Sequence, residues 1–175
     1  TLGGISGTFG DLTIASGAIV TVDAATNVND AFTLNGKIQI LTGNSLELKS
    51  TVTTTGTGTV EGQGTASFTD ASSGNIALVN GSFGSFTINK TAAVGSNADT
   101  IDGANATIVN LTLTSGILKI ADTRQLTITG NVSEGTGKIT GSGSSAKMIN
   151  NSTGGDTFLI DGTCGNVQHS GSADI

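Results

Sequence analysis

Cys164 and His169 are the residues best suited to chemistry, since each is the single residue of its type and they lie five positions apart. A thiol beside an imidazole is the arrangement of a nucleophile and its base. The phrase that contains them, "GTCGNVQH" at 162–169, has two earlier counterparts, "GTFGDLTI" at 7–14 and "GSFGSFTI" at 81–88. Cys164 replaces Phe and His169 replaces Ile of those copies. Both positions therefore predict packing residues in a variant final copy, and we expect no catalytic residue there.

Acidic residues offer two candidate calcium positions. The segment "GGDTFLIDG" at 154–162 resembles one turn of the calcium-binding nonapeptide β-roll, with Asp156 as the acidic residue. That motif works in tandem, and here it occurs once. Asp99 and Asp102, in the polar stretch "AVGSNADTIDGAN" at 93–105, are a second possibility, since calcium takes oxygen ligands. Solvated turns containing Asp account for both places more simply, so we expect no metal and no cofactor.

The composition disfavours several other functional classes. The thirteen acidic residues are dispersed and all six aromatic residues are Phe, whereas glycan-cleaving enzymes use clustered carboxylates beside aromatic rings that stack on sugars. The seven basic residues are scattered and the net charge is −6, which disfavours nucleic acid as a partner. No apolar run approaches the ~20 residues that span a bilayer, so we expect no membrane insertion. The sequence thus favours a protein that is not an enzyme.

Asn-x-Ser/Thr sequons suggest surface glycosylation of a secreted protein. The candidate acceptors are Asn80, Asn89, Asn105, Asn110, Asn131, Asn150 and Asn151. The single Cys excludes an internal disulfide, which is compatible with an extracellular chain stabilised by repetition instead.

The composition predicts an all-β fold. The chain has 27 Gly, no Pro and abundant Thr, Ser and Asn, and these residues favour turns and strands over helices. About a third of the residues are apolar and recur at regular intervals, so a disordered Gly/Ser linker is disfavoured.

Two internal copies of about 75–80 residues and the start of a third organise the chain. Residues 36–64 align with residues 116–143, with apolar residues opposite apolar residues and Gly opposite Gly. We place the first copy at about 1–80, the second at about 81–161 and the partial third at 162–175, within one domain of residues 1–175. About six extra residues near 93–105 predict a longer loop on one face of the second copy.

Apolar residues two positions apart predict short strands with one buried face. Examples are Ile38 with Ile40, Leu46 with Leu48, and Leu126 with Ile128. A β-sandwich and a β-solenoid both accept such strands, but the solenoid generates repeats by construction and tolerates a narrow aliphatic core. We therefore predict a β-solenoid (β-helix) of about seven or eight coils, a rod roughly 35 to 40 Å long at ~4.8 Å per coil.

Lines such as "LTLTSGILKI", "QLTITGNVSEGTGKITGSGS" and "FGSFTINKT" carry a family resemblance. They resemble secreted bacterial β-helix proteins, namely autotransporter passengers and the stalks of filamentous-haemagglutinin-type adhesins. The likeness is one of repeat style and covers nearly the whole chain. It implies an extracellular or cell-surface protein without enzymatic activity.

The two ends of the sequence stand in nearly the same phase of the repeat, and no capping segment is evident at either. Uncapped solenoid ends recruit further strands. We therefore expect a structural subunit of an extracellular filament or stalk that stacks head to tail on copies of itself. The expected interface residues are Leu2, Ile5, Phe9, Cys164, Val167, His169 and Ile175. The alternative is an adhesin or phage tail-fibre module that recognises a surface glycan or protein through the predicted loop at 93–105.

Overall fold

The structure, a computed structural model, describes residues 3–49, 51–72, 78–90, 98–155 and 160–169. The fold is all-β, with 74% of the structure in strands and about seven stacked turns of a parallel β-solenoid. The predicted fold class is confirmed. The strands are β1 (Gly4–Phe9), β2 (Leu12–Ile14), β3 (Ile19–Val28), β4 (Ala31–Leu34), β5 (Lys37–Ile40), β6 (Ser45–Leu48), β7 (Thr53–Thr55), β8 (Thr59–Asp70), β9 (Leu78–Asn89), β10 (Ala98–Ser115), β11 (Ile117–Ile120), β12 (Gln125–Ile128), β13 (Asn131–Glu134), β14 (Lys138–Asn150), β15 (Gly154–Gly155) and β16 (Ile160–His169).

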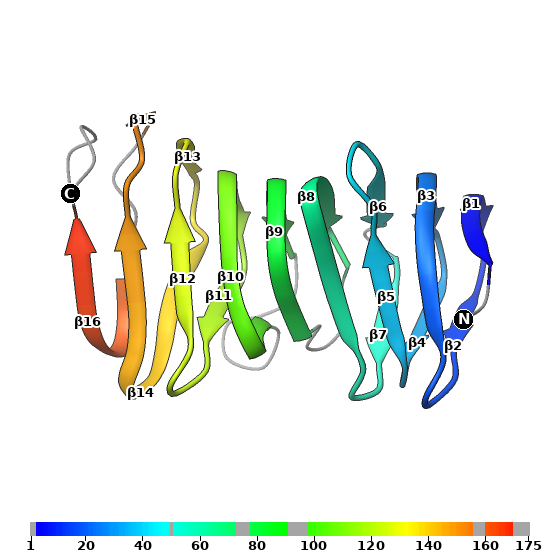
Figure 1. The fold of residues 1–175 in the computed structure, drawn as a ribbon, viewed down its shortest axis with the longest axis horizontal. Coiled ribbons are helices and arrows are strands. Elements are labelled where there is room, and N and C mark those ends of the chain that lie inside the picture. The colour runs from blue at the N-terminus through cyan, green and yellow to red at the C-terminus, as the bar shows by residue number, and fades with distance from the viewer. Residues whose placement is uncertain (1–2, 50, 73–77, 91–97, 156–159, 170–175) are drawn as a thin grey trace.

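Parallel pairing between successive coils builds the solenoid. Val60 of β8 pairs with Val79 of β9, and Val79 pairs in turn with Ile101 of β10. Parallel neighbours cannot be joined by a tight hairpin, so the chain must travel around a whole coil before it pairs again. The coils consequently lie side by side in sequence order, with the N- and C-terminal ends at opposite ends of the row (Figure 1).

Long strands turn a corner of the coil instead of ending there. The first part of β8 pairs with β5, and its last part, Ser67–Asp70, pairs with β6. Its register with β9 shifts between Gly62 and Ala66, where the strand changes face. Gly is required near such a corner, because a Cβ on Gly81 would lie 2.3 Å from the carbonyl oxygen of Gly62. Gly81 also has a φ of +95°, a conformation that favours Gly.

The core is made of inward ladders, in which each coil adds one side chain to a continuous row. One ladder runs through Leu46, Phe68, Phe86, Leu111 and Val132, all buried. The rings of Phe68 and Phe86 lie 5.0 Å apart between centroids, within the range of favourable aromatic pairs. Both Phe residues of this ladder therefore face the core.

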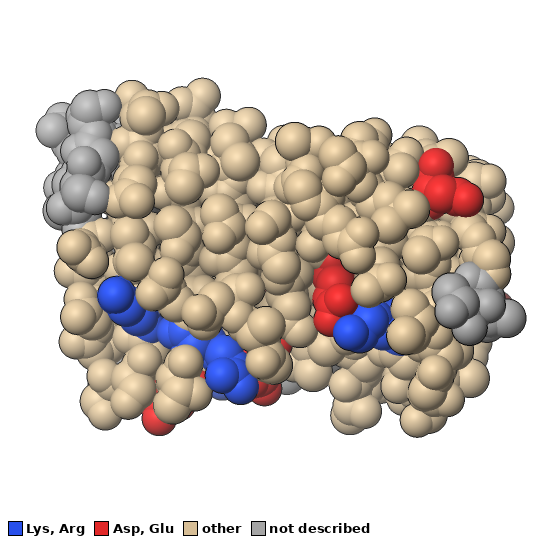
Figure 2. Space-filling view, in the orientation of Figure 1, with Lys and Arg blue, Asp and Glu red and all other residues tan. Residues whose placement is uncertain are grey.

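The aligned segments of the two copies form corresponding strands. Strands β5, β6 and β8 of the first copy reappear as β11, β12 and β14 of the second. The view in Figure 2 shows a surface that is mostly uncharged, with the Lys, Arg, Asp and Glu side chains few and largely in its lower half. The two copies thus share the strands that carry the apolar ladders.

Candidate functional site

The end coils hold the residues predicted to form an assembly interface. Strand β1 pairs with β3, and β16 pairs with β14; within the described residues neither strand has a neighbour on its outer edge. Ile5 and Phe9 are half-buried and pack against the core. Leu2 and Ile175 lie outside the described residues, as does the side chain of His169, whose backbone belongs to β16.

Val167 occupies a ladder position, but much of its surface is exposed to solvent. It stacks on Met148, which is fully buried. Its counterpart in the repeated phrase is Phe86, which is 0% exposed because β8 and β10 cover both of its sides, whereas Val167 is 43% exposed. The last described coil therefore presents an apolar side chain that the interior of the rod would bury.

The repeated phrase lies within β9 and β16, and its first copy begins in β1 and continues into β2. Of these strands, β9 has a pairing strand on each of its two edges. On one edge it pairs with β8, as β16 does with β14. On the other edge it pairs with β10, as β1 does with β3. Each end strand thus makes one of the two strand pairings of β9. The β8–β9–β10 arrangement shows how the same sequence phrase pairs when a coil stacks on each side of it.

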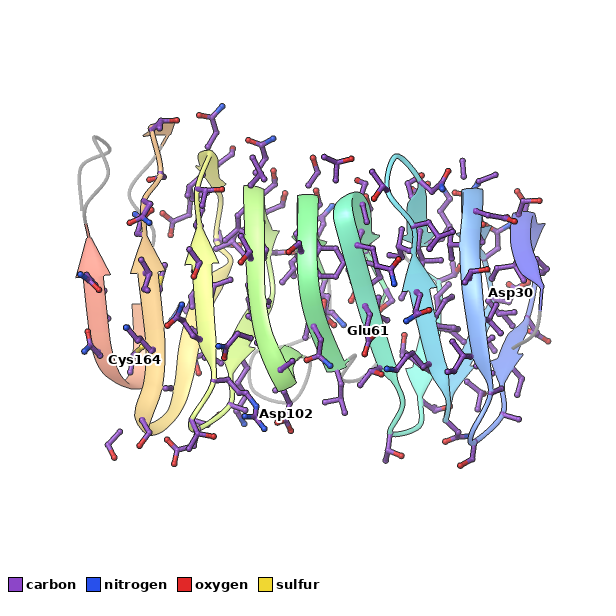
Figure 3. The ribbon with its side chains drawn as sticks, viewed as in Figure 1. Asp30, Glu61, Asp102 and Cys164 are labelled. Carbon is purple, nitrogen blue, oxygen red and sulfur yellow. The ribbon has the colours of Figure 1, made fainter. Side chains whose placement is uncertain are left out.

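Cys164 is a packing residue of the last coil, as its alignment with Phe predicts. It lies on β16 (Figure 3), is half-buried against the core and points its Sγ at the carbonyl oxygen of Ala146, 3.5 Å away. Burial raises the pKa of the thiol above its ordinary value and outweighs the hydrogen bonds with backbone groups of Asn166 and Met148, which lower it. A nucleophilic Cys needs the opposite shift, so the structure gives Cys164 no activated thiolate.

The predicted loop at 93–105 is wrong in its second half. Residues 98–105 belong to β10, where Ala98 to Ile101 pair with β11, and Thr100 and Ile101 also pair with β9. Residues 91–97 lie outside the described part of the chain. The inserted residues therefore include an extra length of strand. The expectation that Asp99 is a solvated turn residue is wrong too, because its side chain is fully buried.

The candidate calcium residues do not come together as ligands. Asp102 lies at the lower edge of the coil (Figure 3), where its Oδ1 accepts from the backbone N–H of Gly103 and lies 3.5 Å from Nε of Arg124. Asp156 lies outside the described residues. Among the residues that are described, no group of three His, Cys, Asp or Glu side chains is placed to hold a metal ion.

The seven sequons fall into two groups. Asn80 and Asn150 are buried, and their Oδ1 atoms accept hydrogen bonds from the backbone N–H groups of Ala104 and Ser152. Glycosylation at these two positions is incompatible with the fold, and the prediction is wrong there. The exposed group remains a prediction: Asn89, Asn105, Asn110, Asn131 and Asn151.

A buried cluster of three ionisable residues is the feature that sequence reasoning missed. Nζ of Lys90 lies 2.8 Å from Oδ2 of Asp70 and 3.3 Å from Oδ1 of Asp99, and all three side chains are 0% exposed. The backbone N–H of Ser72 also donates to Oδ1 of Asp70. Taking charges out of water is expensive, so a buried cation between two carboxyl groups is an unusual feature of a protein core.

The electrostatics of this cluster separate the two carboxyl groups. Burial and the adjacent Asp70 charge raise the pKa of Asp99 well above its ordinary value. Burial would also raise the pKa of Asp70, but the hydrogen bond with Asp99 and the charge of Lys90 outweigh it and leave that pKa below the ordinary value. For Lys90, burial is outweighed by the charges of Asp99 and Asp70, and its pKa is raised. The pKa shifts of the two carboxyl groups therefore run in opposite directions, so that the environment favours the ionised form of Asp70 and the protonated form of Asp99.

The period-two pattern was the signal that could have revealed the cluster. Asp70 lies two residues after the buried Phe68, and Asp99 lies two residues before the buried Ile101. Lys90 likewise lies two residues after a buried ladder residue, Ile88. Each charged side chain thus continues the inward phase of its strand.

The second copy shows the neutral form of the same position. Because Met148 aligns with Phe68, Asn150 corresponds to Asp70, and it makes the same turn contact with the N–H of Ser152 that Asp70 makes with Ser72. The repeated phrase has Gly171 where the middle copy has Lys90. The acidic Asp70 thus precedes the copy of the phrase that carries the lysine, and the amide Asn150 precedes the copy that has glycine in its place.

Fold and sites together define the chain as a parallel β-solenoid with a buried ionic cluster in its core. No helix in the described part of the chain is long and apolar enough to cross a membrane. Comparisons with protein-family models, with curated proteins and with solved structures found no match.

Proposed function

We propose that the chain is a non-enzymatic structural segment of an extracellular filament or stalk, in which β-solenoids stack head to tail through their end coils. The observation that carries this proposal is the difference between Val167 and Phe86. The two occupy the same place in the repeated phrase, yet one is 43% exposed and the other fully buried. A coil stacked on β16 would bury Val167 as β10 buries Phe86.

The geometry of parallel stacking also supports a linear assembly. Among the described strands, β1 and β16 each have one edge without a pairing strand, and these two edges lie at opposite ends of the row of coils (Figure 1). A contact between unlike surfaces repeats as an open filament unless a rotation closes it. The partner in this proposal is therefore a second copy of the chain. The extracellular location rests on the resemblance in repeat style and on the composition.

The test is light scattering and negative-stain electron microscopy of the purified chain over a range of concentrations. We expect unbranched filaments that lengthen with concentration. Val167→Glu should shorten them or abolish them, because a carboxylate would be buried at each joint. The matched control is Val109→Glu, which places the same charge on the side of the rod, at a residue that is 39% exposed. A monodisperse monomer at every concentration, or equal effects of the two substitutions, would contradict the proposal.

A further inference from the structure

We propose that Lys90 and Asp99 form an intramolecular isopeptide bond, with Asp70 as the residue that moves the proton. The product is an amide between Nζ of Lys90 and Cγ of Asp99, formed with loss of one water molecule and without any cofactor. The proposal is independent of the assembly function proposed above. It rests on the geometry of the cluster, its exclusion from water and the complementary protonation of its two carboxyl groups.

The geometry brings nucleophile, electrophile and base into mutual contact. Nζ of Lys90 lies within 3.3 Å of one Asp99 oxygen and 2.8 Å of one Asp70 oxygen. Reacting groups held at such distances gain a large advantage over the same groups free in solution. The three residues come from the end of β8, the residue after β9 and the start of β10, so three successive coils fix their positions.

The packing around Lys90 holds its stem in place. A Cβ on Gly116 would lie 3.0 Å from Cβ of Lys90 and 3.1 Å from Cγ2 of Ile88, so Gly116 leaves just enough room for the lysine. The hydroxyl of Ser115 donates to the carbonyl oxygen of Lys90, and the N–H of Lys90 donates to the carbonyl oxygen of Ser115. The lysine is thus held at both its backbone and its side chain.

Apolar ladder neighbours keep water from the cluster. Asp70 pairs in register with Leu48 in the preceding coil and with Ile88 in the next, and Asp99 pairs with Leu118. All three neighbours are 0% exposed. Amide formation is disfavoured in bulk water, but here it releases water to the solvent and replaces a buried ion pair by neutral groups. Burial therefore favours the product.

The protonation states suit the roles. The raised pKa of Asp99 favours its protonated form, and a neutral acid is a better electrophile than a carboxylate because no negative charge repels the amine. The lowered pKa of Asp70 favours its ionised form, and Oδ2 of Asp70 lies 2.8 Å from Nζ, so Asp70 is placed to take a proton from the ammonium. Two neighbouring carboxyl groups whose environments push their pKa values apart are a recognised sign of separate acid and base roles.

The step balances in atoms and protons. Asp70 accepts one proton from the Lys90 ammonium, and the neutral Nζ then attacks Cγ of Asp99. The new N–C bond forms as the C–OH bond breaks, and Asp70 relays a proton from the nitrogen to the departing hydroxyl, which leaves as water. One proton remains on the amide nitrogen, two leave in the water and one stays on Asp70. Nothing is oxidised or reduced, and the cluster ends without a formal charge.

The first experiment is an intact-mass measurement of the purified chain after denaturation. The proposal predicts a mass lower than that of the sequence by one water molecule. Because trypsin does not cleave after an acylated lysine, the digest should contain the uncut peptide 50–119 in place of cleavage at Lys90. Tandem fragmentation should place the link between Lys90 and Asp99. A chain of full sequence mass, with normal cleavage after Lys90, would overturn the proposal.

Two internal controls separate the link from an unrelated loss of water. A succinimide at Asp102–Gly103 would also remove one water, but it would leave trypsin free to cleave after Lys90 and would react with hydroxylamine. Lys37 and Glu61 have the same Nζ–oxygen distance of 2.8 Å as Lys90 and Asp70, with side chains that are 37% and 22% exposed. Cleavage after Lys37 should therefore be normal, because water surrounds that pair.

Substitutions assign the roles. Lys90→Met should restore the full mass, and Asp70→Asn should slow formation of the link by roughly a hundredfold, the usual contribution of a positioned proton acceptor. If either variant fails to fold, the mass and the digest of the unsubstituted chain still decide the question. A link located at Asp70 instead of Asp99 would overturn the assignment of roles.

Discussion

Nζ of Lys90 lies 2.8 Å from Oδ2 of Asp70, and neither side chain has any exposed surface. The nearest comparison in the chain is the pair of Lys37 and Glu61, which has the same separation at the surface. Equal distances with different burial allow the effect of the environment to be measured within one molecule.

Lys90→Met should destabilise the chain far more than Lys37→Met. Removing one partner of a buried ion pair leaves the others uncompensated and typically costs about 3–5 kcal/mol. The same change at an exposed pair costs about 0–1 kcal/mol, because water already screens the charges. The free energy of unfolding from urea titration measures both. Similar losses in the two variants would show that the buried cluster contributes no more than the surface pair.

The Lys90→Met variant should also be more stable at mildly acidic pH than at neutral pH. Burial raises the pKa of a carboxyl group, and in this variant no lysine opposes that effect at Asp70 and Asp99. A folded-state pKa above the unfolded value of about 4 means that the folded chain binds more protons, so stability falls as pH rises through the folded pKa. Urea unfolding at about pH 5 and about pH 8 checks this. A free energy of unfolding that increases over that interval would contradict it, and Lys37→Met serves as the control.

The sequence predicted the ladders because their signal is redundant. Ile38, Leu46 and Phe68 repeat in spacing and in apolar character, and any one of them could be lost without hiding the pattern. The ionic cluster had no such redundancy. Asp70 and Asp99 are single acidic residues in register with apolar neighbours, and the counterpart of Asp70 in the other copy is the neutral Asn150. A charged residue at an inward position is assigned to the surface when only its residue type is considered. Its place in the inward–outward alternation of the strand would assign it to the core.

The prediction of a loop at 93–105 is wrong in its second half for a related reason. Its Gly, Asn and Asp content favours a loop, and local propensity alone cannot show that a neighbouring strand is available to pair. In the structure Asp99 pairs in register with Leu118 of β11, so tertiary pairing overrides the composition. Asn80 and Asn150 were misplaced on the surface likewise, because a sequon reports local sequence and not the coil around it.

Phe86→Ala should cost about 3–5 kcal/mol, because it leaves a cavity in a core that cannot close around it. The ring of Phe86 lies 5.0 Å from that of Phe68 and 5.3 Å from that of Phe83, so two aromatic contacts are lost at once. Urea unfolding measures the loss. Val109→Ala is the control, since Val109 is exposed and its truncation leaves no internal cavity. Comparable stability of the two variants would argue against a shared aromatic core.

Gly81→Ala should be more harmful than Gly17→Ala, although both residues have positive φ angles of +95° and +76°. Both substitutions place an alanine in an unfavourable conformation, at a cost of about 1 kcal/mol or more. At Gly17 the added methyl group meets nothing within 4 Å, whereas at Gly81 it lies 2.3 Å from the carbonyl oxygen of Gly62. Thermal unfolding of the two variants isolates the effect of close coil stacking. Equal melting temperatures would mean that the coils can separate at this corner without cost.

Alkylation of Cys164 should be slower in the folded chain than in the chain unfolded by urea. Burial raises the pKa of the thiol, so at about pH 7.5 a smaller fraction is thiolate, which is the reactive form. The rate should rise with pH until the thiol is ionised. Iodoacetamide labelling followed by mass spectrometry measures the rate in both states, at a concentration low enough to keep the chain monomeric. If coils stack on β16, raising the protein concentration should slow the reaction further, because a second copy would cover the half-buried Cys164. Equal rates in the folded and unfolded chains would contradict the placement of this thiol against the core.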